Sequence, residues 1–161
     1  MTTFDFGDGK GPVAAHRHFN GGGWVADTAF VAETAYIGPD AQVSDEAQVF
    51  DAAMVFDNAR VYGTVWVFDN ARVFGDALVS GNARVFGTAL VYGTARVFGT
   101  ALVYGNAQVS GNAWVYGNAR VYGDARVYDY AYVYGAARVF DNAVVYGYAW
   151  VYGDAYVYDY R

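Results

Sequence analysis

The sequence predicts an all-β protein in which one chain winds into a parallel β-helix. Three observations predict this fold class. A branched apolar residue, valine in every copy except Ile37, occurs at position 25 and at every sixth position through Val157. A small residue, alanine in every copy except Val65, lies two positions before each of them from Ala29 onward. The last two positions of most repeats are Gly-Asn, Gly-Asp, Gly-Thr or Asp-Asn, which are residue types that suit tight corners.

The alternation Ala-x-Val describes a short strand. Alanine and valine face one side, and the residues between and after them face the other. A six-residue period does not fit an amphipathic helix. A hairpin meander needs reversals between antiparallel strands, whereas the same corner with the same inward pattern at every step describes a chain that turns one way around an axis. The sequence also holds one lysine, Lys10, and no window rich in helix-forming Glu, Lys and Leu.

The stretch GNARVFGTALVYGTARVFGTALVYGNA resembles the hexapeptide-repeat proteins, including bacterial and phage-encoded repeat arrays, and the resemblance extends from Gly23 to the end of the chain. It implies a left-handed parallel β-helix, a solenoid with three hexads in each triangular coil. The left hand is implied by the resemblance alone, because parallel crossovers are otherwise overwhelmingly right-handed. The 23 inward branched residues then build about seven coils, and the rod is on the order of 35 Å long. Glycine follows valine by two places rather than the one place of the commonest family pattern, which affects the corners and not the fold.

Two parts of the chain are predicted: an N-terminal capping segment at 1–23 and a hexapeptide-repeat β-helix at 24–161. The capping segment breaks the repeat and ends with Asn20 and three glycines, which we expect to form a flexible joint that lets the segment fold back over the first coil. Such a cap protects strand edges from edge-to-edge pairing. The array stops in phase, so we expect an open C-terminal edge. End-to-end self-association there and simple protection by Asp159 and Arg161 are equally weighted alternatives.

The composition restricts the partners. A formal net charge of −6 argues against nucleic acid and anionic membrane, because both require a clustered basic surface. Cysteine is absent, which removes disulfides and thiolate sites and leaves the compartment open. The N-terminus lacks the pattern of a signal peptide, and no apolar stretch is long enough to span a bilayer. We expect a soluble protein, in a cytoplasmic, virion or extracellular assembly.

The residue after each inward valine is often aromatic. Positions eighteen apart stack in a three-hexad coil, so one face carries an unbroken ladder: Phe50, Phe68, Phe86, Tyr104, Tyr122, Phe140 and Tyr158. The ladders of the other two faces are interrupted by Ser80 and Ser110. Stacking of rings within one rod explains such ladders. Side-by-side packing of rods explains them too, because exposed apolar surface of this extent is unusual for a monomer. The candidate self-association residues are Phe68, Phe86, Tyr104, Tyr122, Phe140, Tyr158, Tyr156, Tyr160 and Trp150.

Catalytic chemistry has little support in the sequence. The only histidines, His16 and His18, lie before the array, and a capping role suits them better than metal binding. Acyltransferases of the family that the chain resembles use a histidine near the coil interfaces, usually with a loop that interrupts the hexads. This array contains neither. We therefore predict no catalytic residue, no cofactor and no metal site.

Carboxylates stack one coil apart at two corners, Asp51 with Asp69 and Asp141 with Asp159. Paired carboxylates can hold a hard cation or act in acid–base catalysis. Aspartate is also a common corner residue because its side chain bonds to nearby backbone. The corner interpretation is favoured.

These observations predict a non-enzymatic structural rod that self-associates through its aromatic faces or its open C-terminal end, as the building block of a filament or oligomer. Its partner is then a second copy of itself. The alternative is a binding module for a glycan or small ligand in a phage or surface protein, and an acyltransferase-like enzyme is the third reading. Tyrosine is concentrated in the C-terminal half and is enriched at interfaces, so a partner is expected there.

Overall fold

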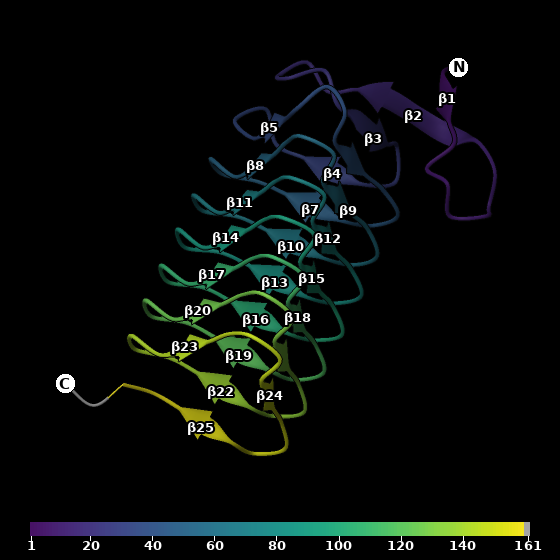
Figure 1. The fold of residues 1–161 in the computed structure, drawn as a ribbon. Coiled ribbons are helices and arrows are strands. Elements are labelled where there is room, and N and C mark those ends of the chain that lie inside the picture. The colour runs from purple at the N-terminus through teal and green to yellow at the C-terminus, as the bar shows by residue number, and fades with distance from the viewer. Residues whose placement is uncertain (160–161) are drawn as a thin grey trace.

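The computed structural model describes residues 1–159 and shows an all-β solenoid of about seven coils (Figure 1). Within the described residues there are twenty-five short strands and no helix. Three sheets run along the rod, and the N-terminus and the last described residues lie at opposite ends of it. The predicted fold class is confirmed.

The first sheet has ten strands, in the order in which they lie side by side: β1 (Thr3–Phe4), β2 (Val13–Arg17), β3 (Trp24–Ala26), β6 (Gln42–Val43), β9 (Arg60–Val61), β12 (Leu78–Val79), β15 (Arg96–Val97), β18 (Trp114–Val115), β21 (Tyr132–Val133) and β24 (Trp150–Val151). The second has eight: β25 (Tyr156–Val157), β22 (Arg138–Val139), β19 (Arg120–Val121), β16 (Leu102–Val103), β13 (Arg84–Val85), β10 (Trp66–Val67), β7 (Gln48–Val49) and β4 (Phe30–Val31). The third has seven: β23 (Val144–Val145), β20 (Arg126–Val127), β17 (Gln108–Val109), β14 (Leu90–Val91), β11 (Arg72–Val73), β8 (Met54–Val55) and β5 (Tyr36–Ile37). We refer to them as the ten-, eight- and seven-stranded sheets.

From β3 onward, each strand pairs in parallel with the strand three further along the chain. Val85 on β13, for example, is in register with Val103 on β16, which makes each coil eighteen residues long, since 103 − 85 = 18. Backbone N–H groups of one coil donate to carbonyl groups of the next: Phe86 N lies 3.0 Å from Val103 O. The hydrogen bonds therefore run along the rod axis and hold the coils together.

The core is a column of alanine and valine. The side chains from Ala35 to Val139 at the two inward positions of each repeat are fully buried, and Val65 fills the one inward position that lacks alanine. Val151 and Val157 are partly buried against the same column. The predicted inward positions are confirmed. Each buried valine contributes about 1.5–3 kcal/mol of transfer free energy, so stability accumulates coil by coil rather than in one central cluster.

The corners place one residue of most repeats in the left-handed region of φ. Glycine occupies this position in most corners, and aspartate occupies it in six others with φ between 55 and 59°. The aspartate side chain accepts a hydrogen bond from the corner above it: Asp69 N lies 3.3 Å from Asp51 Oδ2, and Gly87 N lies 3.0 Å from Asp69 Oδ2. The stacked carboxylates Asp51 and Asp69 are thus explained as corner residues that bond backbone N–H groups of the next coil.

The N-terminal segment extends the ten-stranded sheet rather than only covering its end. Strand β2 pairs antiparallel with β3, and β1 pairs antiparallel with β2. The glycines before β3 differ from the expected flexible joint. Gly23 N donates a hydrogen bond to Ile37 O, and Ile37 N donates one to Asn20 O, each with a donor–acceptor distance of 3.0 Å. A Cβ on Gly21 or Gly23 would overlap Ile37. These glycines are required for close packing against β5.

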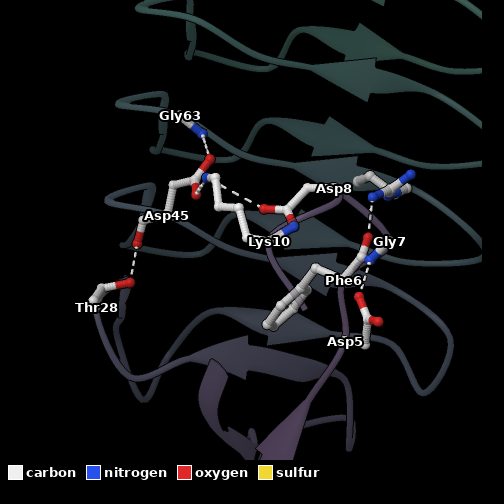
Figure 2. Close-up of polar contacts among 9 residues, drawn as sticks. Asp5, Phe6, Gly7, Asp8, Lys10, Thr28, Asp45 and Gly63 are labelled. Carbon is white, nitrogen blue, oxygen red and sulfur yellow. Dashed lines mark hydrogen bonds and ion pairs between the residues drawn. The ribbon is translucent and has the colours of Figure 1, made fainter. Parts of the chain in front are cut away.

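The same segment is also tied to the side of the rod (Figure 2). Phe6 is buried in a small cluster with Ala15 and Ala26, and its carbonyl oxygen accepts a hydrogen bond from Arg60. Lys10 Nζ lies 2.7 Å from Asp45 Oδ1. These contacts connect the first seventeen residues to the coils that follow, at a position that no repeat pattern indicates.

Candidate functional site

The unbroken aromatic ladder is present on the eight-stranded sheet. The ring of Tyr104 lies 4.9 Å from that of Phe86 and 4.9 Å from that of Tyr122, with interplanar angles of 2° in both pairs. Phe68 and Phe140 continue the stack in the two directions. The structure therefore brings six of the nine candidate residues together in one column: Phe68, Phe86, Tyr104, Tyr122, Phe140 and Tyr158.

Stacking buries much of this ladder. Its inner rungs are half-buried, because each ring covers its neighbours. Burial raises the pKa of the Tyr104 phenol, and the neighbouring Tyr122 raises it further, while Arg120 and Arg138 lower it. Burial likewise raises the pKa of Tyr116 on another ladder. The continuous exposed surface expected from the sequence is therefore present only in part: the inner rungs are half-buried, and Tyr158 at the end of the ladder is 43% exposed.

The remaining candidates lie near the last described coil. Tyr156 belongs to the eight-stranded sheet and is 56% exposed, whereas Trp150 belongs to the ten-stranded sheet and is 64% exposed. Tyr160 lies outside the described residues. The nine candidates thus belong to more than one face of the rod.

Arginine accompanies the ladder of the eight-stranded sheet. Arg84, Arg120 and Arg138 occupy outward strand positions beside it. The guanidinium carbon of Arg84 lies 4.6 Å from the Trp66 ring centroid, and that of Arg138 lies 5.3 Å from the Tyr156 ring centroid. This face consequently carries three positive charges, with Leu102 between Arg84 and Arg120, and like-charge repulsion disfavours its packing against the same face of a second rod.

A second aromatic surface lies on the ten-stranded sheet. One of its two rows belongs to the predicted ladder that Ser80 interrupts, and the adjacent row was not predicted. We call it the double aromatic column, and it consists of Trp114, Tyr132 and Trp150 at outward strand positions together with Tyr116, Tyr134 and Tyr152 just after those strands. Neighbouring ring centroids along the two rows lie 5.0 to 5.8 Å apart. None of the six side chains carries charge at neutral pH. Comparing the residues before and after each valine at a spacing of eighteen would have revealed this surface.

The two histidines belong to the N-terminal segment. His18 is buried, and its Nε2 lies 3.0 Å from Ala35 O, so it hydrogen-bonds to the first coil. His16 Nδ1 lies 2.8 Å from Asp27 Oδ1 in an exposed pair. Within residues 1–159, no three His, Cys, Asp or Glu side chains are grouped so that they could hold a metal ion.

Comparison with known proteins agrees with the fold. Residues 107–120, 119–135 and 137–153 match the family model described as YdcK Beta solenoid repeat, over less than half of the chain. Neither the comparison with curated proteins nor that with solved structures found a significant match. Fold and family model together define the class: this is a repeat β-helix protein.

A membrane-spanning helix was also sought in the described part of the chain, and none there is long and apolar enough to cross a bilayer.

Proposed function

We propose that this β-solenoid is a non-enzymatic structural rod that self-associates side by side through the double aromatic column. The observation that supports this most directly is the gathering of six uncharged aromatic side chains in two adjacent rows on one sheet. Aromatic residues are enriched, and charged residues depleted, in the cores of protein interfaces. Trp150 and Tyr152 in the last coil are 64% and 58% exposed, and the other four rings are half-buried. The surface therefore offers apolar area to a partner chiefly at its C-terminal end.

The double aromatic column suits a second copy better than the eight-stranded ladder does. Parallel stacking gives every rod the same axial spacing, so the rings of one rod can interdigitate with those of another over several coils. Arg84, Arg120 and Arg138 on the eight-stranded sheet oppose such contact by like-charge repulsion. We therefore assign self-association to the ten-stranded sheet and treat the eight-stranded ladder as chiefly internal stabilisation.

Sedimentation velocity over a concentration series tests this assignment. The double variant Tyr132→Ser/Tyr134→Ser removes two rings from the proposed interface, and Tyr104→Ser/Tyr122→Ser is the matched control on the eight-stranded sheet. We expect the first to require at least about tenfold more protein for association, since interface aromatics contribute roughly 1–2 kcal/mol or more each, and the control to resemble the parent. A parent that stays monomeric at high concentration would overturn the proposal. Dissociation in the control alone would assign association to the eight-stranded ladder instead.

We also propose that the chain belongs to the hexapeptide-repeat proteins and winds with a left hand. The eighteen-residue coil, with one strand in every six residues, supports this. An experimental structure with resolved side chains tests it, because a right-handed coil would remove the chain from that family.

A glycan-binding module is the second candidate function. Trp114 and Trp150 on one face provide apolar rings of the kind that pack against sugars, and the neighbouring tyrosines supply hydroxyl groups. Calorimetric titration with oligosaccharides distinguishes this candidate. Binding that the variant Tyr132→Ser/Tyr134→Ser abolishes in a monomeric parent would favour the glycan, and its absence would leave self-association.

A further inference from the structure

Serine replaces an aromatic ring at two interior positions of the ladders, and a hollow opens at each. Ser80 lies on the ten-stranded sheet between the rungs Tyr62 and Phe98, and its hollow of about 200 Å³ is lined by both rings. Ser110 lies on the seven-stranded sheet between Tyr92 and Tyr128, and those rings line its hollow of about 330 Å³. The two hollows therefore share one design: a serine at the base and an aromatic ring on either side.

The spacing of the ladders fixes what such a hollow can hold. Consecutive rungs stand 4.9 Å apart, as in the pairs Phe56–Phe74 and Phe74–Tyr92. Rungs that flank a serine are two coils apart, so twice this separation lies between them. One planar ring placed midway restores the regular stack and contacts a ring on both faces. A puckered, saturated ring makes poorer contact with two parallel aromatic faces.

The surroundings of the two serines differ. Leu78, Arg96 and Trp114 complete the hollow at Ser80. The guanidinium carbon of Arg96 lies 5.0 Å from the Trp114 ring, which holds the cation at the side of the hollow. Gln108, Arg126 and Asp129 give the hollow at Ser110 a more polar rim. Both sites thus combine aromatic faces with hydrogen-bonding groups at their edges.

The chain itself supplies a ring at the comparable position near its N-terminus. In the ladder of the ten-stranded sheet, the first two positions hold the small residues Ala26 and Ser44 in place of aromatic rings. Phe6, from the segment before the array, packs in one cluster with Ala26 and lines a hollow together with Ser44, which is only 7% exposed. Within residues 1–159, by contrast, the hollows at Ser80 and Ser110 are lined only by residues of the array. A ring from another molecule would fill these hollows in the way that the Phe6 ring packs against Ala26.

We propose that the hollows at Ser80 and Ser110 bind the planar aromatic ring of a small molecule of the phenol class. The ring inserts edge-on between the two flanking rungs, and its hydroxyl exchanges hydrogen bonds with the serine hydroxyl at the base or the polar groups at the rim. This inference does not depend on self-association, because each hollow is complete within one chain.

Saturation-transfer NMR on the purified protein tests the inference, with phenol as the probe and cyclohexanol as the matched control. Cyclohexanol has the same ring size and hydroxyl group but is not planar. We expect phenol to bind about tenfold more tightly, since stacking on two aromatic faces is favoured by that order of magnitude. Equal binding of the two alcohols would overturn the proposal, and this comparison requires no variant.

The double variant Ser80→Tyr/Ser110→Tyr locates the sites. A tyrosine at Ser80 continues the ladder that already holds Tyr116 and Tyr134 as consecutive rungs, and a tyrosine at Ser110 continues the ladder that holds Tyr128 and Tyr146. Circular dichroism and the melting temperature should therefore match or exceed those of the parent. We expect phenol binding to be lost. Ser80→Ala/Ser110→Ala leaves both hollows open and should bind phenol within about threefold of the parent, because only a hydrogen bond is removed. Unchanged phenol binding in the tyrosine variant would place the ligand elsewhere and overturn the proposal. A further outcome is that the parent does not bind phenol and the tyrosine variant no longer self-associates. That result would show that the inserted ring comes from a second copy of the chain, and it too would overturn the small-molecule assignment.

Discussion

The ring of Tyr104 stacks on the ring of Phe86 at a centroid separation of 4.9 Å, although a full coil of chain separates them. Directly beside them, Val103 is in register with Val85 inside the rod. The same strand register therefore aligns a column of buried valines and, directly beside it, a column of outward aromatic rings. Substitutions at the buried position and at the outward position that follows it should consequently have very different effects on stability.

Val103→Asp should unfold the protein. Val103 is fully buried in the alanine–valine column, and an unpaired carboxylate there has no water and no partner. The expected cost is more than about 4 kcal/mol, seen as loss of the β-sheet signal in circular dichroism and of cooperative melting. Val103→Ala is the control, because it leaves a small cavity but no charge. A folded Val103→Asp protein with the parent's Tm would contradict the inward assignment of this position.

Tyr104→Ser should leave the fold intact and lower its stability. The substitution removes the stacking contacts with Phe86 and Tyr122, which are worth roughly 1–3 kcal/mol together. Tyr104→Phe keeps both contacts and should melt close to the parent. If the phenylalanine variant were destabilised as much as the serine variant, the hydroxyl group and not the stacking would be responsible.

The fold was predictable because each of its determinants repeats. An inward valine such as Val103 is recognised from local alternation, and the ladder partner of Tyr104 is found by adding one coil length to its number. One row of the double aromatic column was missed because Trp114 and Tyr132 precede their valines, whereas the predicted ladders consist of residues that follow the valines. The packing of the N-terminal segment was not predictable, since the contact between Lys10 and Asp45 occurs once and follows no period.

Aspartate should replace glycine at the corners more readily than alanine does. Gly99 has a φ of +68°, and a Cβ added there would lie 2.9 Å from Gly117 N. Gly99→Ala should therefore cost about 1–2 kcal/mol. Gly99→Asp should cost less, because aspartates at equivalent corners, such as Asp69 with φ 58°, accept a hydrogen bond from the N–H of the next corner. Thermal denaturation of the two variants gives the order, and an alanine variant as stable as the aspartate variant would contradict it.

The N-terminal segment should be held most tightly at intermediate pH. The backbone N–H of Lys10 is the main cause that lowers the pKa of Asp8 below its ordinary 3.8. Because the pKa is lowered, the ionised Asp8 carboxylate stabilises the folded segment above pH 3.8, and this stabilisation is lost as the pH falls through the lower folded-state pKa. The hydrogen bond to Asp45 chiefly raises the pKa of Lys10 above its ordinary 10.5. The protonated Lys10 ammonium therefore stabilises the folded segment below pH 10.5, and this stabilisation is lost as the pH rises through the higher folded-state pKa.

Hydrogen exchange of residues 1–17 as a function of pH measures this window. We expect exchange, corrected for its intrinsic pH dependence, to increase toward both extremes while the core amides from Val61 to Val139 stay protected. Lys10→Gln should raise the exchange of the segment near neutral pH, because the glutamine amide lacks the charge that pairs with Asp45 and Asp8. The control Thr3→Ser lies in the same segment but leaves this ion pair in place. Equal protection of the segment in Lys10→Gln and in the parent would show that its other contacts, such as the Phe6 cluster and the pairing of β2 with β3, hold it against the rod without this ion pair.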